Sequence, residues 1–118
     1  RMFIMAKAVT IKLEDENGKV KTHKAGKIMA RTTRDAMKMY SKLEETDKDG
    51  NPLVSDAESL DMMIELVANS IFKRNDEVTF DTILDGIPAD EIADTLQEVI
   101  MNAMGISEED IQDANEGK

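Results

Sequence analysis

The sequence lacks cysteine and contains one histidine, His23, among 118 residues. Without cysteine the chain forms no disulfide, thiolate zinc site, iron–sulfur cluster or cysteine nucleophile, and a single histidine builds no histidine metal cluster. The longest apolar run, Met2 to Ala6, has five residues, whereas a membrane-spanning helix needs ~20. These shortages predict a soluble protein without a membrane segment, a cysteine or histidine metal site or thiol chemistry, and they fit a reducing cytosol.

Length and composition predict a single domain over residues 1–118, because 41% apolar residues supply enough material for one core. The expected fold class is α+β, mainly α, with an N-terminal β-hairpin followed by a bundle of about four helices. Within it we expect a hairpin arm over residues 1–27, a helical body over residues 28–105 and an acidic mobile tail over residues 106–118.

Alternation of apolar and polar residues over residues 8–13, followed by Asn17-Gly18, predicts a hairpin with a tight turn. The second strand, residues 19–24, is rich in lysine and suits an exposed sheet edge. We predict that His23 in this strand is a surface residue, because it has no nearby acid or nucleophile to activate.

Helical periodicity predicts helices over residues 31–44, 55–73 and 80–85, and from about residue 88 to residue 105. Ser55 and Thr79 are the expected N-caps, and Gly86 and Gly105 are expected to end the last two helices. The expected buried faces are Thr33, Ala36, Met37, Tyr40 and Leu43 in the first helix, Leu60, Met63, Ile64, Val67 and Ile71 in the second, and Ile92, Leu96, Val99, Ile100 and Ala103 in the last.

The formal net charge of -10 is unevenly distributed. Residues 1–44 carry eleven Lys or Arg and five Asp or Glu, net +6, whereas residues 45–118 carry four and twenty, net -16. The basic stretch from Lys19 to Lys42 is compatible with a small nucleic-acid-binding regulator. A solvated or protein-facing role is preferred, because single-strand binders add aromatic stacking platforms and only four aromatic residues are present.

The loop from Glu45 to Asp56 imitates the start of a calcium loop, with acids at alternate positions and a glycine at the bend. Three positions disagree: Glu45 replaces the usual aspartate, Pro52 replaces an apolar residue, and Asp56 is short for a bidentate ligand. We therefore prefer a plain loop between helices and keep calcium sensing as a further alternative.

No catalytic constellation is recognisable, because the acid pairs lie at an expected helix start and in the tail, and no glycine-rich phosphate loop is present. We predict no enzymatic activity, no catalytic residue, no metal and no cofactor. Nine methionines are unusual beside four aromatic residues. They either fill gaps in the core or form adaptable surfaces for another chain. Those mostly outside the expected core faces are Met2, Met5, Met29, Met39, Met62 and Met101.

The segment from Phe80 to Gly105 contains a phenylalanine helix, a Leu-Asp-Gly turn, an acidic helix start, Thr-Leu-Gln and a final Met-Gly. It resembles the C-terminal signature of the tail assembly chaperones of long-tailed (siphovirus-type) bacteriophages or prophages of Gram-positive bacteria. Asp94 departs from the proline expected before Thr-Leu-Gln. The residues of this signature are Phe80-Asp81-Thr82-Ile83-Leu84-Asp85-Gly86, Asp90-Glu91, Thr95-Leu96-Gln97 and Met104-Gly105.

The resemblance implies a non-enzymatic chaperone of the host bacterial cytoplasm that binds and solubilises the tape measure protein and helps recruit tail tube subunits. Family members are often made in two lengths by ribosomal frameshifting, and the terminal Gly117-Lys118 is compatible with a slippery heptamer. The opposite charges of the two halves favour a homo-oligomer. The predicted partner-binding residues are Met62, Leu66, Phe80, Leu84, Gln97, Met101, Lys24, Arg31 and Arg34.

Overall fold

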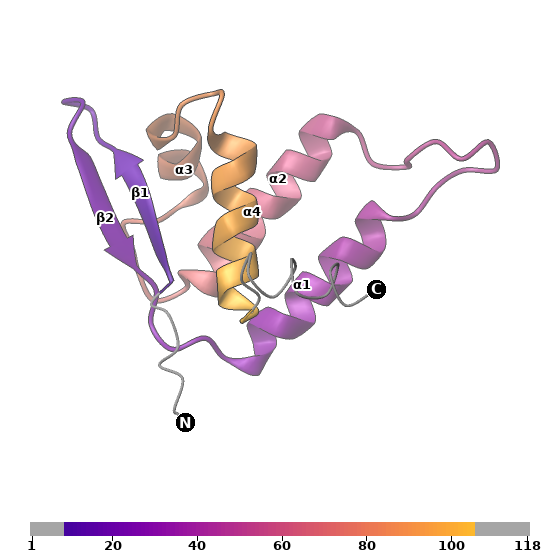
Figure 1. The fold of residues 1–118 in the computed structure, drawn as a ribbon, viewed down its shortest axis with the longest axis horizontal. Coiled ribbons are helices and arrows are strands. Elements are labelled where there is room, and N and C mark those ends of the chain that lie inside the picture. The colour runs from indigo at the N-terminus through magenta and orange to yellow at the C-terminus, as the bar shows by residue number, and fades with distance from the viewer. Residues whose placement is uncertain (1–8, 106–118) are drawn as a thin grey trace, which may run out of the picture.

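The computed structural model describes residues 9–105; residues 1–8 and 106–118 lie outside the described part, and with them Met2, Met5, the expected acidic tail and Gly117-Lys118. Figure 1 shows the hairpin on one side of the molecule, next to α3, and α1 on the other side. The elements are β1 Thr10–Glu14, β2 Val20–Lys24, α1 Ala30–Leu43, α2 Asp56–Leu66, the π-helix η1 Val67–Ile71, α3 Phe80–Gly86 and α4 Ile92–Ala103. This arrangement confirms the predicted α+β, mainly α class, with an N-terminal hairpin followed by helices.

The hairpin turn forms where the sequence predicts it. The Asp15 carboxylate accepts hydrogen bonds from the backbone N–H groups of Asn17 and Lys19, both at 2.9 Å. Gly18 has a φ of 79°, a conformation that glycine adopts without the steric cost of a Cβ. The two strands then pair antiparallel, with Ile11 opposite His23.

One face of the hairpin is buried against the helices. Val9, Ile11 and Leu13 belong to the core, and β1 contacts α3 and α4. His23 is only 8% exposed, so the prediction of a surface histidine is wrong. Residues directly opposite each other in an antiparallel pair share a face, and therefore the partner of Ile11 is buried with it.

The buried face of α1 is rotated from the predicted one. The buried residues are Thr32, Ala36 and Met39, whereas Met37 is 62% exposed and Thr33 is also exposed. The assignment of Met39 outside the core is therefore wrong. Both sets of residues have helical spacing, and the packing of α1 against α2 and η1 selects between them.

The predicted helix over residues 55–73 begins as expected, with a capping box between Ser55 and Glu58, but is not α-helical throughout. Its last part is η1, in which the N–H of Phe72 donates to the carbonyl of Val67 at 2.8 Å, a bond across five residues. The wider turn changes the direction of the side chains that follow it. Those buried around it are Leu66, Val67, Ala68, Ile71 and Phe72.

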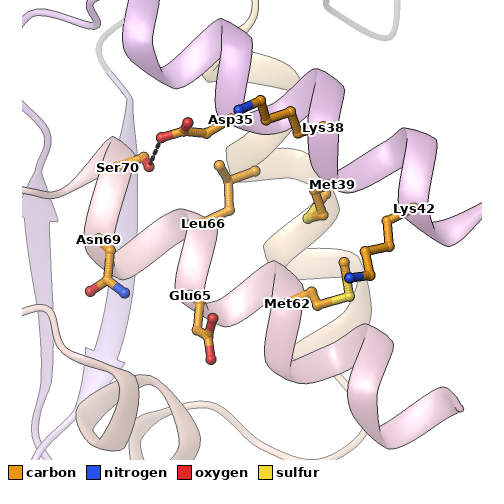
Figure 2. Close-up of a pocket in the computed structure, with 9 residues that line it drawn as sticks. All are labelled: Asp35, Lys38, Met39, Lys42, Met62, Glu65, Leu66, Asn69 and Ser70. Carbon is orange, nitrogen blue, oxygen red and sulfur yellow. Dashed lines mark hydrogen bonds between the residues drawn. The ribbon is translucent and has the colours of Figure 1, made fainter. Parts of the chain in front are cut away.

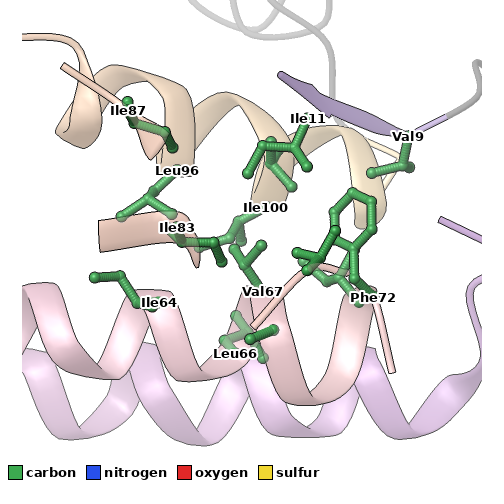
Figure 3. Packing of buried hydrophobic residues seen from close by; sticks show 14 of the residues in the cluster. Val9, Ile11, Ile64, Leu66, Val67, Phe72, Ile83, Ile87, Leu96 and Ile100 are labelled. Atoms are coloured by element: carbon green, nitrogen blue, oxygen red, sulfur yellow. The ribbon is translucent and has the colours of Figure 1, made fainter. Parts of the chain in front are cut away.

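The last two helices largely follow the predictions. Thr79 caps α3, because its hydroxyl accepts from the N–H of Thr82 at 3.2 Å. The helix α4 begins at Ile92 rather than near Pro88, and its buried residues are Leu96, Val99 and Ile100. Figure 3 shows side chains from α3, α4 and η1 converging in the core. Gly105 follows α4 with a φ of 79°, as expected for a residue that ends a helix.

Gly86 has a second structural role besides ending α3. A Cβ at this position would lie 3.1 Å from the carbonyl oxygen of Glu14 and 3.1 Å from the Cβ of Leu13. Both neighbours belong to β1, and one of them is backbone that cannot rotate away. The absence of a side chain at Gly86 therefore allows the hairpin to approach α3 closely.

We predict that Gly86→Ala lowers the free energy of unfolding by about 1–3 kcal/mol, the usual cost of overpacking a well-packed contact. Gly26→Ala is the matched control, because a Cβ there meets nothing within 4 Å. Urea denaturation of the two variants measures the difference. Equal free energies of unfolding for the two variants would contradict the prediction, because α3 and β1 would then move apart at little energetic cost.

Candidate partner-binding surfaces

A groove runs between α1 and the α2–η1 segment, with a volume of about 340 Å³ (Figure 2). We call it the α1–α2 groove. It is lined by Asp35, Lys38, Met39 and Lys42 of α1, by Met62, Glu65 and Leu66 of α2, and by Asn69 and Ser70 of η1.

Helical spacing places these residues on facing sides of the two helices. Met39 and Leu66 are buried and form the floor, and Met62 is half-buried beside them. Lys42 and Glu65 are exposed charged residues that border the groove from opposite helices. The result is an apolar, sulfur-containing floor between charged rims, which suits an amphipathic segment more than a polar small molecule.

Hydrogen bonds close one end of the groove. The Ser70 hydroxyl donates to the Asp35 carboxylate at 2.8 Å, and the Arg34 guanidinium donates to the same carboxylate at 2.9 Å. These two hydrogen bonds lower the pKa of Asp35 below its ordinary value. On the same side of α1, the Thr32 hydroxyl donates to the Ser70 carbonyl at 3.3 Å, so α1 is held to η1 at two points.

The loop after α1 forms a turn that is closed by hydrogen bonds to the side chain of Asp47. Asp47 accepts from the backbone N–H groups of Asp49 at 2.8 Å and Asn51 at 3.0 Å. The bonds from Asn51 and Asp49 lower the pKa of Asp47. Asp47, which the calcium alternative requires as a ligand, is thus turned onto the loop backbone. Within residues 9–105, no three His, Cys, Asp or Glu side chains gather as a metal site would need.

Two cations of the basic stretch form ion pairs with acids of the same chain. Lys21 of β2 pairs with Glu77 at 3.0 Å, and Arg34 of α1 pairs with Asp35. The Lys21 hydrogen bond and charge lower the pKa of Glu77. Two of the cations that the nucleic-acid alternative would use are therefore engaged with acids of the same chain.

The nine predicted partner-binding residues are distributed over several surfaces. Met62 and Leu66 lie together in the α1–α2 groove, and Leu66 is 5% exposed, so it contributes to the floor and to the core. The remaining residues are Arg31 and Arg34 on α1, Lys24 at the end of β2, Phe80 and the 43% exposed Leu84 on α3, and Gln97 and Met101 on α4.

Sequence reasoning missed the α1 side of the groove. Lys38, Met39 and Lys42 recur at helical spacing and so share one side of the helix. The same spacing on α2, Met62 with Glu65 and Leu66, gives the opposite wall. This periodicity was available in the sequence, but the pairing of the two faces depends on how the helices pack.

The helical body presents an apolar groove between charged rims, an arrangement typical of small protein-binding modules. In the part of the chain covered by the structure, no helix is both long and apolar enough to cross a membrane.

Comparison with known proteins agrees with this class. The family described as "Phage tail chaperone protein" matches residues 5–118, nearly the whole chain, and the chain therefore belongs to this family. No curated protein and no solved structure gives a significant match. The match confirms the predicted resemblance to tail assembly chaperones, a family of assembly proteins, whereas the Gram-positive host stays a prediction.

We predict that Asp35→Asn lowers the thermal unfolding midpoint at pH 7 and that this difference disappears at low pH. The pKa of Asp35 is lower in the folded chain than in the unfolded one. Its stabilising contribution is therefore present above the ordinary aspartate pKa of about 3.9 and is lost as the pH falls through the folded value. Thermal melts of wild type and variant from pH 7 down to about pH 2 measure the effect.

Asp61→Asn, an equivalent change on an exposed residue of α2, is the control. A difference between wild type and Asp35→Asn that persists unchanged at the lowest pH would contradict the role of the Asp35 charge.

Proposed function

We propose that this tail chaperone binds apolar helical stretches of the tape measure protein in the α1–α2 groove and keeps that protein soluble in the host cytoplasm. In the same role it would help bring tail tube subunits to the bound chain. Membership of the tail chaperone family supports an assembly role. The observation that carries the proposal is the groove, which has an apolar floor and is open to an extended partner.

The size and lining of the groove favour a helix as the occupant. A volume of about 340 Å³ accommodates a few side chains, as when the apolar face of an amphipathic helix lies in a groove. The thioethers of Met39 and Met62 are flexible and polarizable, so one groove adapts to different apolar side chains. A long helical partner presents many such stretches of varying sequence, and adaptable contacts suit it better than rigid ones.

The charges on the two rims favour one orientation of the bound helix. Lys38 and Lys42 lie on the α1 side, whereas Glu65 lies on the α2 side. A helix whose apolar stripe is bordered by acids on one side and bases on the other would match this arrangement. Such complementary charges contribute more to orientation and association rate than to affinity.

We predict that Met62→Asp weakens the binding of the co-expressed tape measure protein about tenfold or more and thereby lowers its soluble yield. A charge in this apolar contact costs at least about 1.4 kcal/mol, which corresponds to a factor of ten in binding. Met37→Asp is the matched control, because Met37 is exposed on α1 and does not line the groove. The measurement is the soluble fraction of tape measure protein for each variant.

Thermal melts of both variants show whether each remains folded, since Met62 is partly buried. Leu66 is unsuitable for this test, because truncating a buried leucine destabilises the fold itself by about 2–5 kcal/mol. Wild-type yields with a folded Met62→Asp variant would exclude the groove as the binding surface. A tape measure protein equally insoluble with and without the wild-type chain would exclude the chaperone role for that partner.

A further inference from the structure

A second pocket lies on the other side of Ser70, between the start of α1 and the end of η1. We call it the basic pocket. It has a volume of about 240 Å³. It is lined by Gly26, Lys27, Met29, Arg31 and Thr32 from the first segment and by Ser70, Ile71, Lys73 and Arg74 from the second.

The charge of this pocket is of one sign. Lys27 and Arg31 come from one segment and Lys73 and Arg74 from another, more than forty residues along the chain, and no acidic residue lines the pocket. The ion pairs formed within residues 9–105 join Lys21 to Glu77 and Arg34 to Asp35, and neither includes a lining cation. The fold therefore concentrates positive charge here in a chain whose net charge is -10.

The start of α1 adds to the positive potential. The N-cap residue Met29 provides no side-chain hydrogen bond, and the first turn of the helix contains no acid. Acids near a helix N-terminus interact favourably with the helix dipole, whereas cations such as Arg31 do not. An anion in the basic pocket would reduce the repulsion among the cations. It would also interact favourably with the positive end of the α1 dipole.

We propose that the basic pocket binds a carboxylate-rich peptide segment, and that its occupant is residues 106–118 of the same chain. This segment carries five acids and one lysine. It directly follows Gly105 and α4, and α4 packs against η1, whose end lines the pocket. Thirteen residues span up to ~45 Å when extended. This is comparable with the 46 Å longest extent of the molecule, so the segment is long enough to reach the cations.

A tethered acidic segment fits this pocket better than a nucleic acid does. Single-strand binders combine cations with aromatic stacking platforms, and no aromatic residue lines the basic pocket. Attachment to the same chain also gives the segment an effective concentration of the order of millimolar, which an independent ligand rarely reaches. Contacts between carboxylates and Arg31 or Arg74 can be bidentate, which favours carboxylates over less directional anions.

The test compares the 118-residue wild-type chain with a variant of the same length in which the acids of residues 106–118 are neutralised. The neutralising substitutions are Glu108→Gln, Glu109→Gln, Asp110→Asn, Asp113→Asn and Glu116→Gln. Fluorescence anisotropy then measures the binding of a labelled synthetic peptide with the wild-type sequence of residues 106–118. We expect the neutralised chain to bind this peptide about tenfold more tightly, because the wild-type tail competes for the same pocket.

Two charge reversals locate the site. Arg31→Glu with Arg74→Glu, placed in the neutralised chain, is expected to abolish peptide binding. Lys19→Glu with Lys48→Glu changes the net charge equally at exposed residues outside the basic pocket and is expected to leave binding unchanged. Thermal melts show that each variant is folded.

Several results would overturn the proposal. These are equal peptide binding by the wild-type and neutralised chains, equal effects of the two charge reversals, and undiminished binding of a peptide in which the acids are amides. Tighter binding of a single-stranded oligonucleotide than of the peptide would identify a nucleic-acid site instead. Complete displacement of the peptide by inorganic phosphate at equal concentration would identify a site for free anions. Both of those outcomes reject the tail as the specific occupant.

Discussion

The fold depends on one helical segment serving as the packing partner of the other three helices. The α2–η1 segment contacts α1, α3 and α4, and the hairpin reaches this core through α3 and α4. An ordinary helix buries one stripe, which is narrow for three partners. Leu66 at the end of α2 and Val67 and Ala68 in η1 are buried in succession, because partners pack on more than one side of this segment. Few aromatic side chains are available, and the core is built mainly from aliphatic ones around Phe72.

The same segment positions both proposed binding surfaces. Ser70 of η1 lines the α1–α2 groove and the basic pocket, and its bonds to Asp35 and Thr32 hold α1 between them. The two surfaces differ in charge: the rims of the groove carry both signs, whereas the charged residues that line the basic pocket are all cations. A change in how α1 lies on η1 would therefore alter both surfaces at once.

Membership of the tail chaperone family and the apolar groove both favour a role in binding other proteins. The groove has the properties of an adaptable binding surface, since thioether side chains fit partners of different shape. The net charge of -10 makes copies of such a protein repel one another in solution. The basic pocket is a local concentration of positive charge, and the acidic residues 106–118 are its proposed counterpart.

The sequence by itself determined the features that depend on near neighbours. These are the turn at Gly18, the caps at Ser55 and Thr79, and the buried face of α4, each decided by residues within a few positions. Only the tertiary structure shows that Thr32, Ala36 and Met39 are the buried side of α1 and that His23 is buried. It also shows where the helix becomes π-helical and how closely β1 approaches Gly86. Of the predicted binding residues, only Met62 and Leu66 meet in one groove, because their surroundings come from α1. Turns and caps depend on hydrogen bonds between residues close in sequence. Which face of a helix or strand is buried depends on the distant segments that pack against it in the core.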